Sequence, residues 1–250
     1  MNSRLTGLPK ESWGLHEQVV FNVLFEENPQ FALFATDKSA AAVLYSAKPL
    51  WVYAEEGCNS DVLTALLNEC RDKFIKTGLI VPEFAADLCA DLFHPKETHS
   101  MAAFYLPPHV RYENENALVY PNESDVPMLE NWIKCFYMEA LGIDYIEADT
   151  AKALITGKKL YCLEAGGRLA AMGMIIPLPN NMCRLNLIYV PPEFRKAGCG
   201  KAVVSAICAD IQARGMLPVL YARCENTAAC SLYKSLGFTE AGRLAELIFN

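Results

Sequence analysis

The sequence predicts an α/β chain with two domains, each a mixed sheet with helices on both faces. Three observations lead to this fold class. Segments with strand and helix periodicity alternate along the chain, and a polar stretch at 107–116 that begins with two prolines interrupts them. The order of elements before that stretch repeats part of the order after it. We place the boundary near residue 112, which predicts an N-terminal domain of residues 1–112 and a C-terminal domain of residues 113–250.

In the C-terminal part, each element has a local signal. Apolar residues recur at helical spacing from 126 to 141, and Gly166-Gly167 between two β-prone runs is typical of a hairpin turn. Pro191-Pro192 ends the preceding strand because proline cannot donate to a strand ladder. The expected elements, in chain order, are a strand at 117–120, helices at 126–141 and 150–156, strands at 160–163, 169–176 and 182–190, a helix at 200–214, a strand at 217–224, a helix at 227–236 and a strand at 244–249.

The N-terminal part repeats the later portion of this order. We expect a hairpin of strands at 31–36 and 40–45, a strand at 50–53, a helix at 61–75, a strand at 78–81, a helix at 83–92 and a strand at 101–105. Both parts therefore read hairpin, strand, helix, strand, helix, strand, which we interpret as an internal duplication.

Composition excludes several classes of protein. The chain has 250 residues, of which 52% are hydrophobic, so it can form a core and is not disordered. Its net charge of −7 gives no general attraction to nucleic acid or to anionic membranes. There is no apolar run long enough for a signal peptide or a membrane span, and the 10 cysteines contain no CxxC pair. We therefore expect a cytoplasmic protein with reduced, mostly buried thiols.

The most informative segment runs from Arg195 to Lys201, between an expected strand and an expected helix. Gly198 and Gly200 permit tight backbone curvature, and the amides at the helix start would point at an anion. The segment is not a Walker loop, because Arg195 and Ala202 replace the first glycine and the last hydroxyl residue, and Val203 breaks the dinucleotide pattern. Taken alone, the segment is equally compatible with a basic turn whose glycines serve only the backbone geometry.

Two motifs together resemble a known family. The run from Tyr189 to Gly200 resembles the coenzyme A motif of the GCN5-related N-acetyltransferases, and the run from Glu225 to Phe238 resembles their second signature, an Asn that opens a helix ending in Leu-Tyr-x-x-x-Gly-Phe. The order and separation of the motifs match as well. The resemblance covers residues 113–250 and implies that fold, with a second, degenerate domain of the same kind in tandem before it.

The resemblance implies direct transfer of an acetyl group from acetyl-coenzyme A to a primary amine. The amides from Lys196 to Lys201 would hold the pyrophosphate, the Ile188 N–H would polarise the thioester carbonyl, and Tyr233 would protonate the departing thiolate. Strands 182–190 and 217–224 would separate to admit the cofactor. The implied cofactor-binding residues are Ile188, Tyr189, Val190, Arg195, Lys196, Ala197, Gly198, Cys199, Gly200, Lys201, Asn226 and Tyr233, with Cys199 assigned no chemistry. Asn226 is also expected to cap its helix.

No general base follows from the sequence. All 4 histidines lie in the first part of the chain, at 16, 94, 99 and 109. At the strand position where several family members carry Glu, this chain has Arg184, followed by Asn186 on the same face. The remaining candidates are Glu139, Asp144, Glu147 and Glu164, each of which is also readily explained as a solvated carboxylate. A chain of water molecules or an already neutral amine would serve equally well.

Other functions remain open at this point. Without a base, the chain could be a non-catalytic sensor of acyl-coenzyme A, or an interaction protein with a vestigial site. The stretch 55–60 of the first domain has two carboxylates and no Arg or Lys, so we expect no coenzyme A there. The expected partner is a small-molecule or peptide amine, without nucleic acid, membrane or metal, bound by a monomer or homodimer.

Overall fold

The structure, a computed structural model, describes residues 13–25, 29–35, 37, 39–44, 49–113, 118–142 and 148–249. Their contacts divide into two units. The first runs up to Phe104 and includes Tyr221–Glu225 and the chain from Glu240 onward, while the second comprises Tyr105–Leu220 and Asn226–Thr239. Two C-terminal segments therefore group with the first part of the chain, so the contact units differ from a single cut at residue 112.

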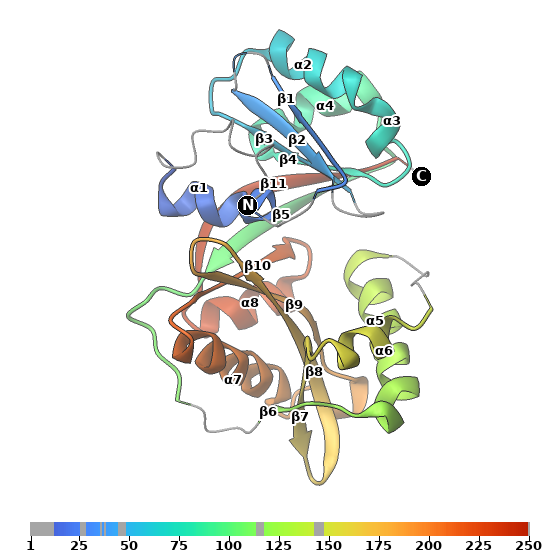
Figure 1. Ribbon diagram of the computed structural model, residues 1–250, viewed down its shortest axis with the longest axis vertical. Coiled ribbons are helices and arrows are strands. Elements are labelled where there is room, and N and C mark those ends of the chain that lie inside the picture. The colour runs from blue at the N-terminus through green and yellow to red at the C-terminus, as the bar shows by residue number, and fades with distance from the viewer. Residues whose placement is uncertain are drawn as a thin grey trace. The chain divides into compact units, whose positions relative to one another are not determined.

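Among the described residues, the second unit contains five strands, in the order β10-β9-β8-β7-β6 (Figure 1). The pair β9–β10 is parallel and the other three pairs are antiparallel, so this sheet is mixed, as predicted. The strands are β6 (Leu118–Val119), β7 (Leu160–Ala165), β8 (Arg168–Leu178), β9 (Met182–Tyr189) and β10 (Leu217–Arg223), of which β10 leaves the unit after Leu220.

Helices cover both faces of this sheet. They are α5 (Val126–Leu141), α6 (Thr150–Thr156), α7 (Cys199–Ala213) and α8 (Thr227–Ser235). Leu129 and Ile133 of α5 share a core with Met172 of β8. The next strand residue, Gly173, lies against Ile207 of α7. Because successive strand residues point to opposite faces, α5 and α7 pack on opposite sides of the sheet.

The first unit has its own mixed sheet, in the order β1-β2-β3-β4-β11-β5. Only β3–β4 is parallel among the pairs β1–β2, β2–β3, β3–β4 and β4–β11. The strands are β1 (Phe31–Phe34), β2 (Ala40–Leu44), β3 (Leu50–Ala54), β4 (Leu79–Pro82), β5 (Glu97–Tyr105) and β11 (Thr239–Ile248). The helices are α1 (Leu15–Val20), α2 (Ser60–Glu69), α3 (Arg71–Phe74) and α4 (Ala86–Phe93), with 3-10 turns η3 (Asn22–Phe25) and η4 (Glu83–Ala85).

Most predicted elements are present, and the exceptions have local causes. The helix predicted at 61–75 is divided between α2 and α3 at Cys70, a fully buried residue with helix-breaking backbone angles. Strand β5 begins at Glu97, whereas the sequence predicts a start at 101. The prediction misses the first residues because they are polar and carry no apolar pattern. The first residues of β11, which begins at Thr239 and not at the predicted 244, are missed for the same reason.

Helix α1 and the turn η3 were not predicted, and they pack on the first unit through polar contacts. The Tyr221 hydroxyl lies 3.1 and 2.8 Å from the carbonyl oxygens of Val19 and Val20, and 2.7 Å from Oδ1 of the buried Asn22. Trp13 and Phe21 also pack on the ring of Tyr53. This segment depends on contacts with residues distant in sequence, and its own pattern is too short to predict a helix.

All ten cysteines are free thiols, and six of them are buried, in agreement with the predicted burial. Burial raises the pKa of the Cys89 and Cys162 thiols to about 12. Among the described helices, none combines the length and the apolar character needed to span a bilayer.

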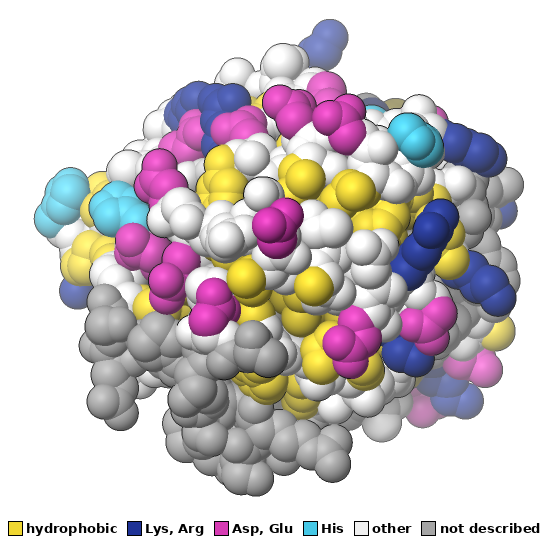
Figure 2. Space-filling view, turned by 90° about the horizontal axis from the view of Figure 1, so that it is seen from above, with side chains coloured by type: hydrophobic (Ala, Val, Ile, Leu, Met, Phe, Trp, Pro, Cys, Tyr) yellow, Lys and Arg dark blue, Asp and Glu magenta, His cyan; other side chains and the backbone are white. Residues whose placement is uncertain are grey.

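The face of the first unit that carries α2, α3 and α4 is rich in carboxylates. Figure 2 shows acidic side chains scattered across this face between hydrophobic ones, with Lys and Arg mostly toward its edges. Glu55 and Glu56, which precede α2, are both exposed. The local charge therefore disfavours binding of an anion at the start of α2.

The buried ion pair between Arg223 and Glu246 should contribute strongly to stability. Its Nε–Oε2 distance is 2.7 Å, and the two side chains are only 11% and 13% exposed. Arg223→Leu leaves a nearly buried carboxylate without its cation, so we expect the free energy of unfolding in urea to fall by about 3 kcal/mol. Arg243→Leu is the control, because Arg243 pairs with Glu240 at the surface, and should cost less than about 1 kcal/mol. Equal losses would contradict this assignment.

Stability should fall as the pH rises above 9, because buried thiols resist ionisation. Burial raises the pKa of Cys89 from 9.0 to about 12. The folded state therefore retains a proton that the unfolded chain loses above pH 9, and the associated stability is lost as pH rises toward 12. Raising the pH from 7 to 10 should lower the free energy of unfolding in urea for both proteins. The decrease for Cys89→Ala should be about 1.4 kcal/mol smaller than for the unmodified protein. Parallel pH profiles would rule out this contribution.

Candidate functional site

The connection from β9 to α7 forms a concave turn at a helix start. The 3-10 turn η6 (Pro192–Phe194) follows β9, and α7 begins at Cys199. Lys196 and Gly198 have positive φ angles of 62° and 83°. Left-handed residues at alternate positions curve the backbone so that successive N–H groups converge, and the dipole of α7 is positive at the same place. The turn therefore has the geometry of an anion site.

Arg195 supports this turn from within. Its Nη2 donates to both Glu139 carboxylate oxygens, at 3.0 and 2.7 Å, and its Nε donates to the Val190 carbonyl at 2.9 Å. The guanidinium also lies over the ring of Tyr189, 5.6 Å from its centroid. The sequence predicts Arg195 as one of three positive charges for an anion, but its charge is paired with Glu139. Lys196 and Lys201 are exposed and carry the positive charge of the turn.

Strand β9 is irregular just before this turn. Met172 of β8 pairs with Tyr189, and Met174 pairs with Asn186, so Leu187 and Ile188 together lie opposite the single residue Gly173. Leu187 has a φ of 51°, and its N–H donates to the Asn186 side-chain oxygen at 2.8 Å. This is a β-bulge, which interrupts the ladder and redirects the side chains that follow it.

Gly173 makes room for the bulge. A Cβ atom at this position would lie 2.7 Å from Cδ1 of Ile188 and 2.5 Å from Cδ1 of Ile207. The Ile188 side chain is therefore directed toward α7. In contrast, the Tyr189 ring is buried beside Trp132 of α5, with a centroid distance of 6.2 Å. Burial raises the pKa of Tyr189 to about 12, so this phenol stays neutral.

The parallel pairing of β9 with β10 is short. It joins Leu217 to Met182, Pro218 to Cys183 and Val219 to Arg184, and the ladder ends there. The C-terminal half of β9, which carries the bulge, lies beyond this ladder. The sequence predicts that these strands separate, and a ladder confined to their first residues is compatible with that prediction.

The second signature forms α8 and the turn before it. The Asn226 side-chain oxygen accepts the Ala229 N–H at 3.1 Å, which confirms the predicted helix cap. Tyr233 lies in the last turn of α8, buried against the ring of Phe238 at a centroid distance of 5.8 Å. Burial raises the pKa of Tyr233 well above its ordinary value. The phenol therefore holds its proton at neutral pH.

The remaining predicted residues have simple positions. Ala197 and Val190 lie in the turn and at the end of β9, and Cys199 is a buried first residue of α7. Gly200 lies in the first turn of α7, where a Cβ atom would be 3.5 Å from Leu232 of α8 and in ordinary contact.

Two residues that shape the site were not predicted for that role, Gly173 and Asn186. Gly173 lies in a strand of apolar residues, where an isolated glycine often marks a bulge or a close approach. Asn186 could have been found because it is an asparagine inside an otherwise apolar strand, and asparagine favours left-handed turns and hydrogen bonds to the nearby backbone.

The structure does not single out a general base among the candidate residues that it describes. Glu139 is held by Arg195, which disfavours its use as a base, and Glu164 is exposed at the β7–β8 hairpin. Arg184 is buried in β9 and carries no basic lone pair at neutral pH. Asp144 and Glu147 lie outside the described residues.

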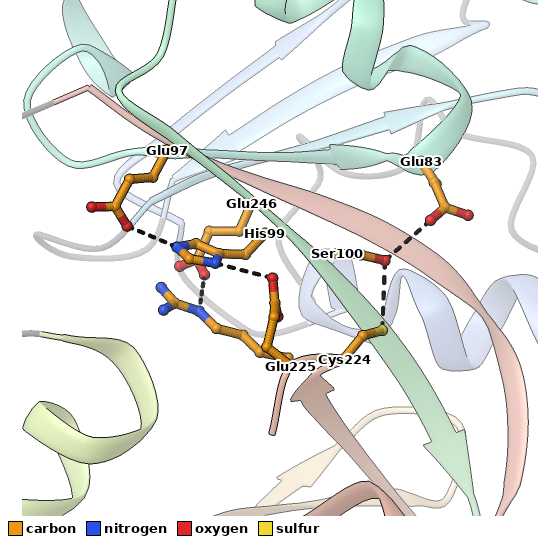
Figure 3. A network of polar contacts seen from close by, with 8 residues as sticks. Glu83, Glu97, His99, Ser100, Cys224, Glu225 and Glu246 are labelled. Atoms are coloured by element: carbon orange, nitrogen blue, oxygen red, sulfur yellow. Dashed lines mark hydrogen bonds and ion pairs between the residues drawn. The ribbon is translucent and has the colours of Figure 1, made fainter. Parts of the chain in front are cut away.

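A histidine does lie next to the second signature, although it is distant in sequence. In the first unit, His99 of β5 has its Nε2 3.0 Å from Glu97 and its Nδ1 3.2 Å from Glu225 (Figure 3). Glu225 directly precedes Asn226. The sequence assigns all histidines to the other domain, but residues Tyr221–Glu225 group with the first unit, and this brings Glu225 to His99.

The same network holds the end of β10 in place. Ser100 donates to Glu83 at 3.1 Å, Cys224 donates to Ser100 at 3.5 Å, and the Cys224 N–H donates to the Ser100 carbonyl at 2.8 Å (Figure 3). Although partial burial acts to raise it, hydrogen bonds from its own backbone and from His99 hold the pKa of Glu225 below its ordinary value. In the part of the chain that the structure describes, no group of three or more His, Cys, Asp or Glu residues is arranged to hold a metal ion.

The C-terminal part of the chain is similar in sequence to known proteins. Residues 165–246 match the family model described as FR47-like protein. The chain is 34% identical over 80 residues to a ribosomal protein bS18-alanine N-acetyltransferase of Salmonella typhimurium, and 32% identical over 80 residues to that of Escherichia coli. Each alignment covers 32% of this chain and 53% of the relative, so the chain spans about half the length of the curated relatives it matches.

The fold is shared over a longer stretch. A GCN5-related N-acetyltransferase from Kribbella flavida superposes with a TM-score of 0.61 and 13% identity, covering 94% of this chain and 96% of that one. This likeness establishes the mixed α/β fold predicted from the sequence.

The two glycines of the turn should respond differently to alanine. Gly198 has a φ of 83° and nothing within 4 Å of an added Cβ, so Gly198→Ala strains the backbone without a steric clash. We expect a loss of about 1–2 kcal/mol in unfolding free energy. Gly200→Ala should be neutral or slightly stabilising, because Gly200 is helical and a Cβ fits. Thermal unfolding of both variants measures the difference, and the reverse order of stability would refute the described turn.

Proposed function

Because this chain belongs to the GCN5-related N-acetyltransferase family, we propose that it transfers an acetyl group from acetyl-coenzyme A directly to a primary amine. The observation that carries the proposal is the combination of the anion-binding turn at 195–201 with the bulge in β9 directly before it. These features would supply a place for a pyrophosphate and, a few residues away, the end of a strand that lies beyond its ladder with β10.

The residues of the turn fit the proposed cofactor. The backbone N–H groups from Lys196 to Lys201 would hold the pyrophosphate, and the Lys196 and Lys201 ammonium groups would balance its charge. Arg195 would keep the turn in shape through Glu139 and Val190. When bound, acetyl-coenzyme A supplies an activated thioester.

The bulge gives Ile188 a role in polarising the reacting carbonyl. A bulge leaves one residue unpaired in the ladder, and we assign the Ile188 N–H as the donor to the thioester oxygen. Backbone groups of Tyr189 and Val190 would hold the pantetheine arm. Asn226 would orient the start of α8 while also contacting the cofactor.

Tyr233 would act as the acid. Its burial raises the pKa and keeps the phenol protonated, so the hydroxyl can donate a hydrogen bond, and then its proton, to the departing thiolate once the two are aligned. The proton of the attacking amine would leave to water, or the amine would bind already neutral.

The acceptor is proposed only as a class. The names of the relatives specify an alanine of a ribosomal protein, which makes a peptide N-terminus one candidate amine beside small-molecule amines. We further propose that residues 113–250 form the working domain and that residues 1–112 are a degenerate copy without cofactor. The exposed Glu55 and Glu56 support the second point. The free thiols support a reducing compartment such as the cytoplasm.

Calorimetric titration with acetyl-coenzyme A tests the proposed cofactor. We expect one site per chain, retained with desulfo-coenzyme A and lost in Gly198→Glu, where a carboxylate would meet the pyrophosphate. Gly215→Glu is the matched control, because Gly215 also has a positive φ, of 71°, and open space around a Cβ. It should bind normally. Loss of binding in both variants, or no binding by the unmodified protein, would refute the proposed cofactor site.

Tyr233→Phe tests the acid. The variant should reduce kcat on a reactive amine by about a hundredfold while the affinity for acetyl-coenzyme A stays unchanged. An equal loss of affinity would instead make Tyr233 a packing residue. A protein that binds acetyl-coenzyme A but acetylates no amine would be a sensor rather than an enzyme.

A further inference from the structure

A cavity in the second unit is not used by the proposed reaction. It has a volume of about 410 Å³ and lies between the start of α5, the β7–β8 hairpin and η6. Its lining residues are Val119, Tyr120, Pro121, Asn122, Asp125, Met128, Trp132, Glu164, Gly167, Arg168, Leu169, Glu193 and Phe194. The volume suits a small molecule.

Three aromatic residues are among those that line this cavity. Tyr120 is 53% exposed although it is aromatic, whereas Trp132 is buried and contributes little surface. Phe194 completes the set from η6. The faces of such rings carry partial negative charge and attract cations. The exposed Tyr120 ring is therefore available to a ligand of positive charge.

The ionised groups of the cavity point to the same sign of ligand. The lining contains three carboxylates, those of Asp125, Glu164 and Glu193, and one cation, Arg168. The Arg168 guanidinium lies over the Phe194 ring, 5.4 Å from its centroid, and Asp125 accepts the Asn122 N–H at 2.8 Å. Across the described residues, no ion pair is formed by Glu164 or Glu193. Two exposed carboxylates therefore line the cavity without a described ion pair, and the lining as a whole has three carboxylates and one cation.

We propose that this cavity binds a small organic cation of the alkylammonium type. The carboxylates of Glu164 and Glu193 would balance the charge, and the rings of Tyr120 and Phe194 would contact the alkyl groups. An anionic occupant, such as the nucleotide end of coenzyme A, is disfavoured by the excess of carboxylates. The cavity and the anion-binding turn are therefore separate sites of opposite charge preference, although Glu193 and Phe194 directly precede Arg195.

Choline and its neutral isostere 3,3-dimethyl-1-butanol test the proposal on the full chain. A quaternary ammonium cannot be acetylated on nitrogen, so binding is measured independently of any transfer reaction. Ligand-observed NMR titration should show saturable binding of choline at millimolar concentration, weakened by added salt. The neutral isostere should not compete.

Variants locate the binding. Glu164→Gln/Glu193→Gln should weaken choline about tenfold, and Tyr120→Ala about threefold, whereas Glu123→Gln, an exposed carboxylate outside the lining, should change nothing. All these positions are at the surface, and circular dichroism verifies that each variant folds. The proposal fails if choline does not bind, if the neutral isostere binds equally, or if the double variant binds choline as well as the unmodified protein. It also fails if adenosine 3′,5′-bisphosphate occupies the cavity, detected as competition with choline.

Discussion

The interruption of β9 is the constraint on which the candidate site depends. Asn186 binds the Leu187 N–H with its own side chain, which holds Leu187 in a left-handed conformation that an L-residue rarely adopts. Gly173 on the facing strand leaves space for the extra residue. As a result, Ile188 turns toward α7 while Tyr189 turns toward Trp132 of α5. Both helices are thereby anchored to the strand that leads into the turn.

Charge is divided between neighbouring parts of the second unit. Arg195 is bound by Glu139 and Val190 and lies over the Tyr189 ring, so it fixes the shape of the turn. The exposed lysines supply the attraction of the turn for an anion. On the other side of the same short segment, Glu193 contributes to a cavity rich in carboxylates. A chain with a net charge of −7 therefore presents a cationic turn and an anionic cavity within a few residues.

Local patterns predicted the second unit closely. Helices α5 and α6 begin and end at the predicted residues, and Asn226 caps α8 as expected. The two motifs likewise indicated the turn and Tyr233. Prediction was poorer where an element lacks a pattern of its own: α1 depends on Tyr221, about 200 residues away, and the start of β5 is polar.

The sequence by itself therefore determined most of the elements, the two motifs and the burial of most cysteines, because each follows from residues close together in the chain, and its composition determined the excess of acidic residues. Only the tertiary structure decided that Arg195 pairs with Glu139, that Gly173 accommodates the bulge, and that His99 lies beside Glu225. The physical reason is that strand pairing and helix packing join residues far apart in sequence. No local propensity encodes which carboxylate will meet which cation once those elements pack.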